Sequence, residues 1–228
     1  MQIQVFSGNG MRAALAELAP QFERACGHTL QVSYDPGQII LRRVDNGETA
    51  DVALLGEEAI DRLIAHGILL SASRRVLTRN GIGVGVRAGA PKPDIATQAA
   101  FVRALRAAGS VAYTSEGASG IYFAALIERL GIGEIVRAKA RTQPGGLVGE
   151  LVVAGQAEIA IQQLPELLAV PGIDVVGPLP DEVQKINTTA AGVFARSPAG
   201  AAASRLIEFL ASPPACEVFR ARGFEPAS

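Results

Sequence analysis

The stretch Gln2-Ile3-Gln4-Val5-Phe6-Ser7-Gly8-Asn9-Gly10 opens the chain and decides its fold. Polar and apolar residues alternate over Gln2–Phe6, which predicts a β-strand. A short loop of small residues follows, and Met11–Cys26 then carries apolar residues at helical spacing up to Gly27. A strand that enters a helix through such a loop is the first half of a βαβ unit, so a parallel sheet is expected.

The same order recurs along the chain. The spacing predicts further strands at Thr29–Tyr34 and Asp51–Leu55, and helices at Gln38–Val44 and Glu57–His66. Later expected strands are Ile82–Val86, Ser110–Tyr113, Ala157–Gln162, Val175–Gly177 and Thr188–Ala195, and later expected helices are Phe101–Ala108, Ile121–Leu130, Leu147–Ala154, Ala199–Leu210 and Pro213–Arg222. Alternating strands and helices predict an α/β chain whose sheets are mostly parallel.

The composition excludes several classes of protein. Of 228 residues, 49% are hydrophobic and 19% are charged, and the net charge is −1, so the chain is neither disordered nor a nucleic-acid binder. No run of 18 apolar residues suggests insertion into a membrane. Two cysteines and two histidines are too few for a disulfide scaffold or a four-cysteine zinc site, and no cofactor motif is present. We therefore expect no metal and no cofactor, and free, partly buried thiols at Cys26 and Cys216.

The first residues leave two cellular locations open. Met1–Phe6 has no basic region, apolar run or cleavage site of a signal peptide. If Met1 is the native start, the protein is expected in the cytoplasm. If a signal peptide has been removed, it is expected in the periplasm.

Four loops that lead from a strand into a helix are the candidate binding elements. Ser7–Gly10, Asp35–Gln38 and Thr114–Gly120 each join a strand end to a helix start through small or polar residues, and Gly145-Gly146 is a fourth. Ligands bind at the carboxyl ends of parallel strands, and helix N-termini favour anions. The candidate ligand-binding residues in these loops are Ser7, Gly8, Asn9, Gly10, Gly37, Gln38, Thr114, Ser115, Ser119, Gly120, Gly145 and Gly146. The alternative is that the three serines only cap helices.

Three further side chains could act on a ligand. Arg42 shares a helix face with Gln38 and could form a bidentate pair with a carboxylate, unless it is simply solvated. Gln163, at a strand end, could donate its amide to the ligand or cap the strand. Glu116 is the best-placed carboxylate for proton transfer, and its alternative role is an acid near a helix start.

Five segments together resemble one protein family over essentially the whole chain. They are Val5–Gly10, Asn46–Leu54, Gly117–Gly120, Gly155–Ala160 and the tail Ala203–Phe224. The series is similar to the molybdate-binding family of ABC-transporter solute receptors. Each segment is loosely defined, but their order is specific to the type II periplasmic-binding fold.

The resemblance implies a fold, a ligand class and a partner. It implies two α/β lobes with a small anionic ligand in the cleft between them, lobe one from residues 1–80 and 190–228 and lobe two from residues 81–189. The hinges would lie near Gly81 and Thr189. If the protein is exported, an ABC permease is the implied partner.

Departures from the family pattern point away from molybdate. The resemblance implies a serine in each of two loops and a late tyrosine around the oxyanion. Ser7 matches, but Asp35–Gln38 has no hydroxyl group and no tyrosine follows Gln184. The leading prediction is therefore a solute-binding protein for an organic carboxylate. The alternative is an isomerase of an unsaturated carboxylate, similar to aconitate-isomerase relatives of this group, with Glu116 as the catalytic residue.

Overall fold

The computed structural model describes residues 1–227 and divides them into two compact units. Unit 1 comprises Met1–Arg79 and the chain from Asn187 onward, and unit 2 comprises Asn80–Ile186. The expected second crossover near Thr189 falls inside a strand, because Thr189 pairs with Gly56 in the sheet of unit 1. The units therefore change at Ile186/Asn187.

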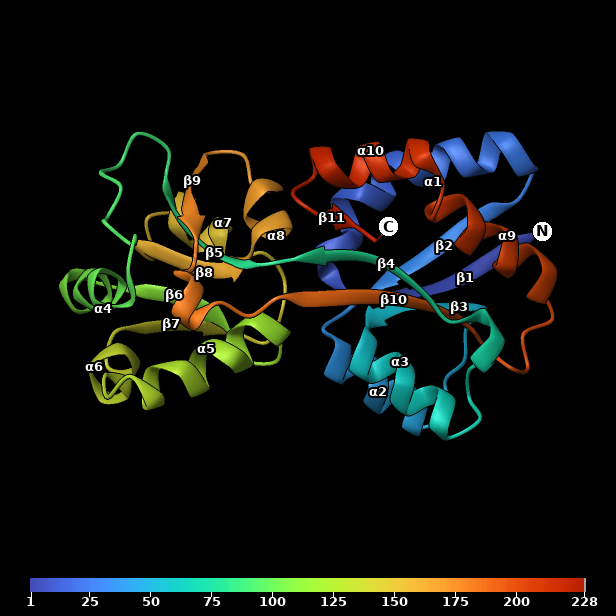
Figure 1. Cartoon of the computed structure of the whole chain (residues 1–228), viewed down its shortest axis with the longest axis horizontal. Helices are drawn as coiled ribbons and strands as arrows, with labels where there is room; N and C mark the ends of the chain where they lie inside the picture. The colour runs from blue at the N-terminus through green and yellow to red at the C-terminus, as the bar shows by residue number, and fades with distance from the viewer. Residues whose placement is uncertain (228) are drawn as a thin grey trace. The chain divides into compact units, whose positions relative to one another are not determined.

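Unit 1 is a sheet with helices on both faces (Figure 1). Its strands, in the spatial order β11-β4-β10-β3-β1-β2, are β1 (Gln2–Ser7), β2 (Thr29–Tyr34), β3 (Val52–Gly56), β4 (Arg75–Asn80), β10 (Asn187–Val193) and β11 (Glu225–Pro226). Its helices are α1 (Arg12–Cys26), α2 (Gly37–Asp45), α3 (Glu57–Ala65), α9 (Gly200–Leu210) and α10 (Pro213–Ala221), with 3-10 turns η1 (Asn9–Met11) and η2 (Ser71–Ser73).

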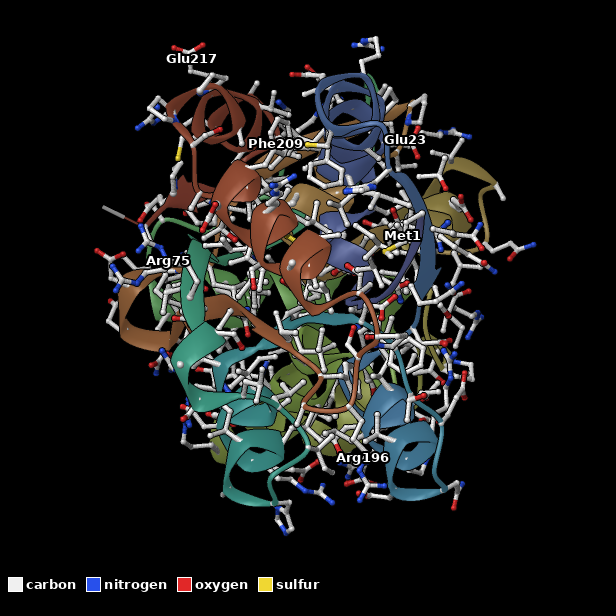
Figure 2. All side chains as sticks on the ribbon, turned by 90° about the vertical axis from the view of Figure 1, so that its right-hand side faces the viewer. Met1, Glu23, Arg75, Arg196, Phe209 and Glu217 are labelled. Carbon is white, nitrogen blue, oxygen red and sulfur yellow. The ribbon has the colours of Figure 1, made fainter. Side chains whose placement is uncertain are left out.

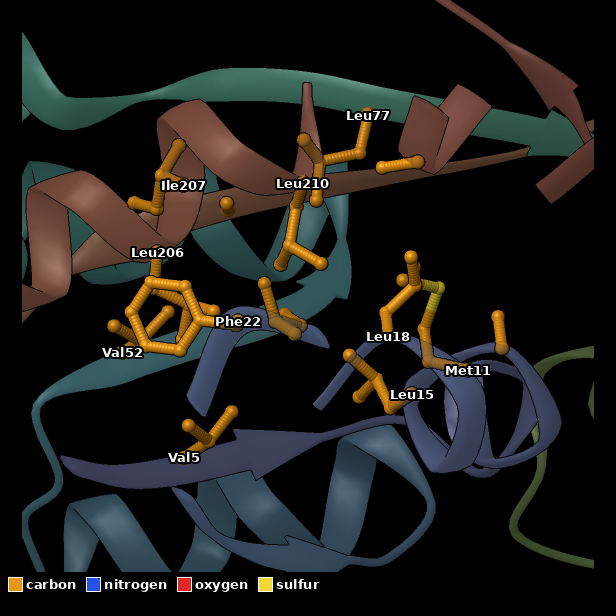
Figure 3. Close-up of a cluster of buried hydrophobic side chains, with 14 of the residues drawn as sticks. Val5, Met11, Leu15, Leu18, Phe22, Val52, Leu77, Leu206, Ile207 and Leu210 are labelled. Atoms are coloured by element: carbon orange, nitrogen blue, oxygen red, sulfur yellow. The ribbon is translucent and has the colours of Figure 1, made fainter. Parts of the chain in front are cut away.

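Two hydrophobic clusters hold the helices of unit 1 to its sheet. One joins α1, α9 and α10 to one face, with Leu15 and Phe22 buried against Val5 and Val52 (Figure 3). The other joins α2 and α3 to the opposite face. Strand alternation explains this division, because successive side chains point to opposite faces. Charged side chains such as the labelled Arg196 stand on the surface of this unit (Figure 2).

Unit 2 repeats this architecture. Its strands, in the order β7-β6-β8-β5-β9, are β5 (Ile82–Arg87), β6 (Val111–Thr114), β7 (Ala140–Gln143), β8 (Ile159–Gln163) and β9 (Ile173–Pro178). Its helices are α4 (Gln98–Ala107), α5 (Ala118–Arg129), α6 (Gly133–Arg137), α7 (Gly149–Val153) and α8 (Leu164–Leu168), with the 3-10 turn η3 (Asp181–Val183). One cluster joins α4, α5 and α6 to one face, and a smaller one joins α7 and α8 to the other.

Each sheet is mixed. The expected parallel pairing is present between β1 and its neighbours β2 and β3, and between β6 and its neighbours β7 and β8. Antiparallel strands extend both sheets: β10 pairs with β3, and β5 pairs with β8 and β9. The predicted α/β class is confirmed, and Cys26 and Cys216 are free and half-buried as predicted.

Gln184 joins the two ends of unit 2. Its Oε1 accepts a hydrogen bond from the backbone N–H of Ile82, and its Nε2 donates to the carbonyl of the same residue, both at 2.9 Å. The amide thus pairs with the backbone of β5 as a neighbouring strand would. The segment that enters unit 2 and the segment that leaves it are fixed side by side.

Several elements differ from the sequence-based expectation. Helix α5 begins at Ala118 instead of Ile121, so Ser119 and Gly120 lie inside it. Helices α6 and α8 and strands β4 and β7 were not expected, whereas α7, which is also only five residues long, was. No helix within residues 1–227 combines the length and apolar character needed to span a membrane.

Candidate functional site

In unit 1, backbone hydrogen bonds gather the carboxyl ends of three strands. Gly8 N–H donates to the carbonyl of Leu54 at 3.0 Å, and Asp35 N–H donates to the carbonyl of Ser7 at 3.2 Å. The loops Ser7–Gly10 and Asp35–Gln38 are therefore neighbours beside the end of β3. This is the edge at which ligands bind in open α/β sheets.

Ser7 is not a helix cap. Its side chain is fully buried, and its Oγ donates to the carbonyl of Gly8 at 3.2 Å. The turn η1 and helix α1 are preceded by Gly8 and Met11, and neither has a side-chain cap. The capping alternative is wrong for Ser7, whose hydroxyl lies buried at the edge of the sheet.

Arg12 and Tyr34 are functional candidates at this edge that the sequence analysis did not name. The guanidinium of Arg12 lies over the Tyr34 ring, 4.2 Å from its centroid, and Tyr34 is the register partner of Ser7 in the parallel pair β1–β2. Burial raises the pKa of Tyr34 and Arg12 partly offsets this, so the phenol stays a neutral donor near pH 7. The predicted strands, Gln2–Phe6 and Thr29–Tyr34, differ in length by one residue, so the sequence alone did not pair Ser7 with Tyr34.

Arg43, which the sequence analysis did not select, is held in place beside Arg42. It donates to Asp35 at 2.5 Å, to Ser33 at 2.8 Å and to Glu48, and it stacks on the Phe6 ring at 4.5 Å. Hydrogen bonds to Glu48 and then Asp35 raise its pKa further above the usual range. Arg43 thus anchors the Asp35 loop.

The predicted residues of helix α2 lie at the surface. Arg42 and Gln38 are both exposed, and Gly37 is the first residue of the helix. Their shared helix is confirmed, and their contact with a ligand stays a prediction.

In unit 2, two of the predicted loops are joined. Ser115 N–H donates to the carbonyl of Gln143 at 2.8 Å, and Glu116 N–H donates to that of Pro144 at 3.1 Å. The segment that leads to Gly145 and Gly146 is therefore fastened to the loop that opens α5. Gly146 has a φ of +86°, which glycine adopts without strain.

Glycines let helix α5 begin directly on Thr114. A Cβ at Gly120 would clash with the carbonyl of Thr114, and one at Gly117 would clash with its hydroxyl. The Thr114 Oγ1 is buried and has no hydrogen-bond partner among the described residues. This loop therefore holds a buried hydroxyl whose hydrogen-bonding capacity the described chain does not use.

The two serines of this loop are not caps. The cap residue of α5 is Gly117, without a side-chain hydrogen bond, and Ser119 is buried inside the helix. Ser115 is exposed, and its Oγ lies 3.5 Å from the carbonyl of Gln143. Glu116 is half-buried and lies just before the cap residue.

The two glutamines at the end of β8 have separate tasks. Gln162 is buried, accepts a hydrogen bond from Val148 N–H at 3.0 Å and donates to the carbonyl of Gly146 at 2.7 Å. Gln163 accepts through its Oε1 from Asn80 at 3.0 Å. Gln162 therefore shapes the Gly145-Gly146 loop, and Gln163 ties the strand end to the start of unit 2.

Glu166 is a buried carboxyl that the sequence analysis missed. It lies in α8, one turn beyond Gln162, and is 5% exposed. Burial raises its pKa to about 8, against the lowering effect of hydrogen bonds with the Gln163 backbone and the Gln162 side chain. An acid near a proline is ordinary at a helix start, so the burial of Glu166 could not be predicted from its neighbours in the chain. No three His, Cys, Asp or Glu side chains within residues 1–227 could hold a metal ion.

Known proteins resemble this chain over nearly its full length. Residues 3–225 match the family described as bacterial extracellular solute-binding protein. An aconitate isomerase from a Pseudomonas species is 38% identical over 230 residues, covering 98% of this chain and 87% of the isomerase.

Solved structures share the fold. The periplasmic molybdate-binding protein of Azotobacter vinelandii matches with a TM-score of 0.82 at 18% identity, over 99% of this chain and 100% of the other. The sulfate-binding protein SubI from Mycobacterium tuberculosis matches with a TM-score of 0.80 at 20% identity, over 100% of this chain and 88% of the other. These matches confirm the two-lobed α/β fold of periplasmic binding proteins. The chain belongs to the family of bacterial extracellular solute-binding proteins.

Proposed function

We propose that the protein binds a small organic carboxylate. The observation that carries this proposal is the edge of unit 1, where the buried Ser7 lies in register with Tyr34 and Arg12 covers the Tyr34 ring. A hydroxyl group, a neutral phenol and a guanidinium together offer donors and a positive charge. A guanidinium suits the planar, two-oxygen geometry of a carboxylate.

Unit 2 supports the same ligand class with neutral groups. Thr114 supplies a buried hydroxyl group beside the glycines that open α5. The twelve-residue helix α5 adds the partial positive charge of its N-terminus. The full set of proposed ligand contacts is Ser7, Gly8, Asn9, Gly10, Arg12, Tyr34, Gly37, Gln38, Arg42, Thr114, Ser115, Ser119, Gly120, Gly145, Gly146 and Gln163.

A carboxylate is preferred over an inorganic oxyanion. The Asp35–Gln38 loop carries a carboxylate side chain and no hydroxyl group, and Asp35 is bound to Arg43. The relative of 38% identity is an aconitate isomerase, and aconitate is a carboxylate.

A thermal-shift series tests the ligand class. Aconitate, citrate, succinate, molybdate and sulfate are each added at rising concentration. A ligand at a hundred times its dissociation constant adds about 2.7 kcal/mol to the free energy of unfolding. We expect stabilisation by a carboxylate, and stabilisation by molybdate alone would contradict the proposal.

A second candidate function is isomerisation of an unsaturated carboxylate. The aconitate isomerase relative, which aligns with 98% of this chain, favours it. Moving a double bond requires removal of a proton from carbon and return of a proton elsewhere, and Glu116 is the proposed group. Glu116 lies at the start of α5 and is half-buried.

Proton exchange at carbon separates the two functions. The protein is incubated with aconitate in heavy water, and deuterium uptake is followed by NMR. Uptake that is lost in Glu116→Gln while aconitate still binds supports an isomerase with this residue. Tight binding without uptake supports the binding protein alone.

We also propose that an exported form delivers the ligand to an ABC permease. The match to the extracellular solute-binding family supports export. Fractionation of the source cells tests it, and recovery in the cytoplasm alone would contradict it.

A further inference from the structure

Asp35 is a carboxylate at the edge of unit 1 where the proposed function places an anion. Its backbone N–H donates to the carbonyl of Ser7 at 3.2 Å, which puts it directly beside a proposed ligand contact. It also opens the loop that contains the proposed contacts Gly37 and Gln38. A negative charge at this position repels an anion, so the presence of a carboxylate here needs a separate explanation.

Arg43 holds Asp35 in place without leaving a surplus of positive charge. Its Nη1 donates to Asp35 Oδ2 at 2.5 Å and to Ser33 Oγ at 2.8 Å, while its Nε and Nη2 donate to Glu48. One positive charge therefore faces two negative charges, and the group of three charged side chains stays negative. Arg43 fixes the carboxylate of Asp35 but does not turn this group into an anchor for an anion.

One oxygen of the Asp35 carboxylate remains available to a ligand. Arg43 binds Oδ2, and no hydrogen bond from within residues 1–227 reaches Oδ1. The side chain is 32% exposed, so a bound molecule can reach it. An ionised carboxylate only accepts hydrogen bonds, and a ligand can therefore satisfy Oδ1 only with a donor such as a hydroxyl group.

The positive charge at this edge lies on the other face of strand β2. Ser33 and Asp35 both bind Arg43 and so share one face, whereas the Tyr34 side chain, between them in sequence, lies on the opposite face under Arg12. The edge thus offers a cation and donors on one side and a fixed acceptor on the other. A ligand that satisfies both sides carries a carboxylate and, separately, a hydrogen-bond donor.

We propose that Asp35 is a specificity-determining residue that accepts a hydrogen bond from a hydroxyl group of the ligand, so that the site selects hydroxycarboxylates. Arg43 is the positioning residue that holds this acceptor. The inference rests on the proposed binding of a carboxylate and narrows the class of ligand. Sulfate and molybdate carry no proton at neutral pH, so Asp35 repels them and receives no hydrogen bond in return.

The first test compares pairs of acids that differ only in a hydroxyl group. Citrate is paired with tricarballylate, and each enantiomer of malate is paired with succinate. Calorimetry at neutral pH measures the dissociation constant of each acid for the wild type. The hydroxy acid should bind at least about tenfold more tightly than its partner, which is the lower end for a hydrogen bond to a charged group.

The outcomes of this comparison separate the inference from the proposed function. Equal dissociation constants within both pairs would overturn the inference and leave the proposed binding of a carboxylate standing. If none of these acids binds, both are overturned.

The second test uses Asp35→Asn, which keeps the size of the side chain and removes its charge. The preference for citrate over tricarballylate should fall to about threefold or less, because a neutral amide oxygen is a weaker acceptor. Tricarballylate should also bind more tightly than it binds the wild type, because the repulsion is gone. A purely structural role of Asp35 would weaken the binding of both acids equally, and that result would overturn the inference.

Asp45→Asn is the matched control. Asp45 is the last residue of helix α2, and its carboxylate pairs with Arg62 at 2.8 Å, so the variant also removes an acid from an arginine pair. It should keep the wild-type preference for citrate. An equal loss of preference in both variants would show an effect of net charge alone and would overturn the role of Asp35.

A third measurement uses only the wild-type chain, in case Asp35→Asn does not fold. Carbon-13 NMR follows the Asp35 side-chain carboxylate as the protein is saturated with citrate or with tricarballylate. A clearly larger change in chemical shift with citrate is expected, because only citrate donates a hydrogen bond from a hydroxyl group. The same change with both acids would overturn the inference.

Discussion

The two units use the same strand–loop–helix design but stabilise it with different chemistry. The edge of unit 1 is charged and partly exposed: Arg12 lies over Tyr34, and Arg43 binds Asp35 and Glu48. At the edge of unit 2, Thr114 and Glu166 each have a buried oxygen atom without a partner among the described residues, and Glu116 is the half-buried charged group of that loop.

This difference suggests that one unit attracts the anion and the other positions it. Partly exposed charges respond to salt and attract an anion over a distance, whereas buried neutral groups are sensitive to shape and to proton loss. Unit 1 should therefore contribute charge to affinity, and unit 2 should contribute geometry. Four measurements test this contrast between the units.

The pH dependence of stability caused by Glu166 should be the strongest of these effects. Its pKa rises to about 8 on folding, so between pH 4.5 and pH 8 the native state keeps a proton that the unfolded state loses. The free energy of unfolding should therefore fall as the pH rises through this range, by on the order of 5 kcal/mol. Urea unfolding of the wild type and of Glu166→Gln at a series of pH values measures this fall. The same change of the free energy of unfolding with pH in both proteins would contradict the prediction.

Next in size is Gly120→Ala. A Cβ there would clash with the Thr114 carbonyl, so α5 and β6 must separate. We expect a loss of about 3 kcal/mol in the free energy of unfolding. Gly37→Ala is the control in unit 1, because nothing lies within 4 Å of its added Cβ. That variant should change stability by less than about 1 kcal/mol. Similar losses in the free energy of unfolding for both variants would show that the two units do not differ in packing at these helix starts.

A smaller effect is expected on binding from Arg12→Ala. Losing a charged donor should weaken carboxylate affinity by about 10- to 30-fold, or about 1.4–2 kcal/mol, with little change in stability. Arg24→Ala is the control, since Arg24 is an exposed arginine in the last turn of the same helix. Calorimetry with aconitate provides the comparison, and equal affinities for both variants would exclude Arg12 as a ligand contact.

The smallest effect should come from Asp35→Asn, which removes one partner of Arg43. The pair is partly exposed, so we expect a loss of up to about 1 kcal/mol that shrinks in 1 M salt. Asp45→Asn breaks the more exposed Arg62 pair and should cost less. A loss that does not change with salt would show that the Asp35 loop depends on shape and not on charge.

The sequence predicted the repeating elements well and the short ones poorly. Thr29–Tyr34 matched β2 in full, and Met11, Leu15, Leu18 and Phe22 are buried as their spacing predicts. Helix α8 carries no period that five residues could reveal, and Glu166 was missed with it.

The site was predicted at the level of loops rather than side chains. Small residues at strand ends marked Ser7–Gly10 and Thr114–Gly120, and hydrogen bonds join each to a second predicted loop. The sequence analysis selected Arg42, and not Arg43, for a specific contact. The spacing of residues along the chain could not have corrected that choice. The anchoring of Arg43 depends on Asp35 and Glu48, whose approach only the folded chain creates.

The hydrogen bonds between Gln184 and Ile82 bring together the two ends of unit 2, which is inserted in the chain of unit 1, here called the host. Two residues 102 positions apart close the ends of unit 2, and β4 and β10 of unit 1 are neighbours in one sheet. An insertion with adjoining ends disturbs its host little, because a short turn could replace it. By the same reasoning, loops or strands of unit 2 can change in length without altering the neighbouring positions of β4 and β10 in the sheet of unit 1.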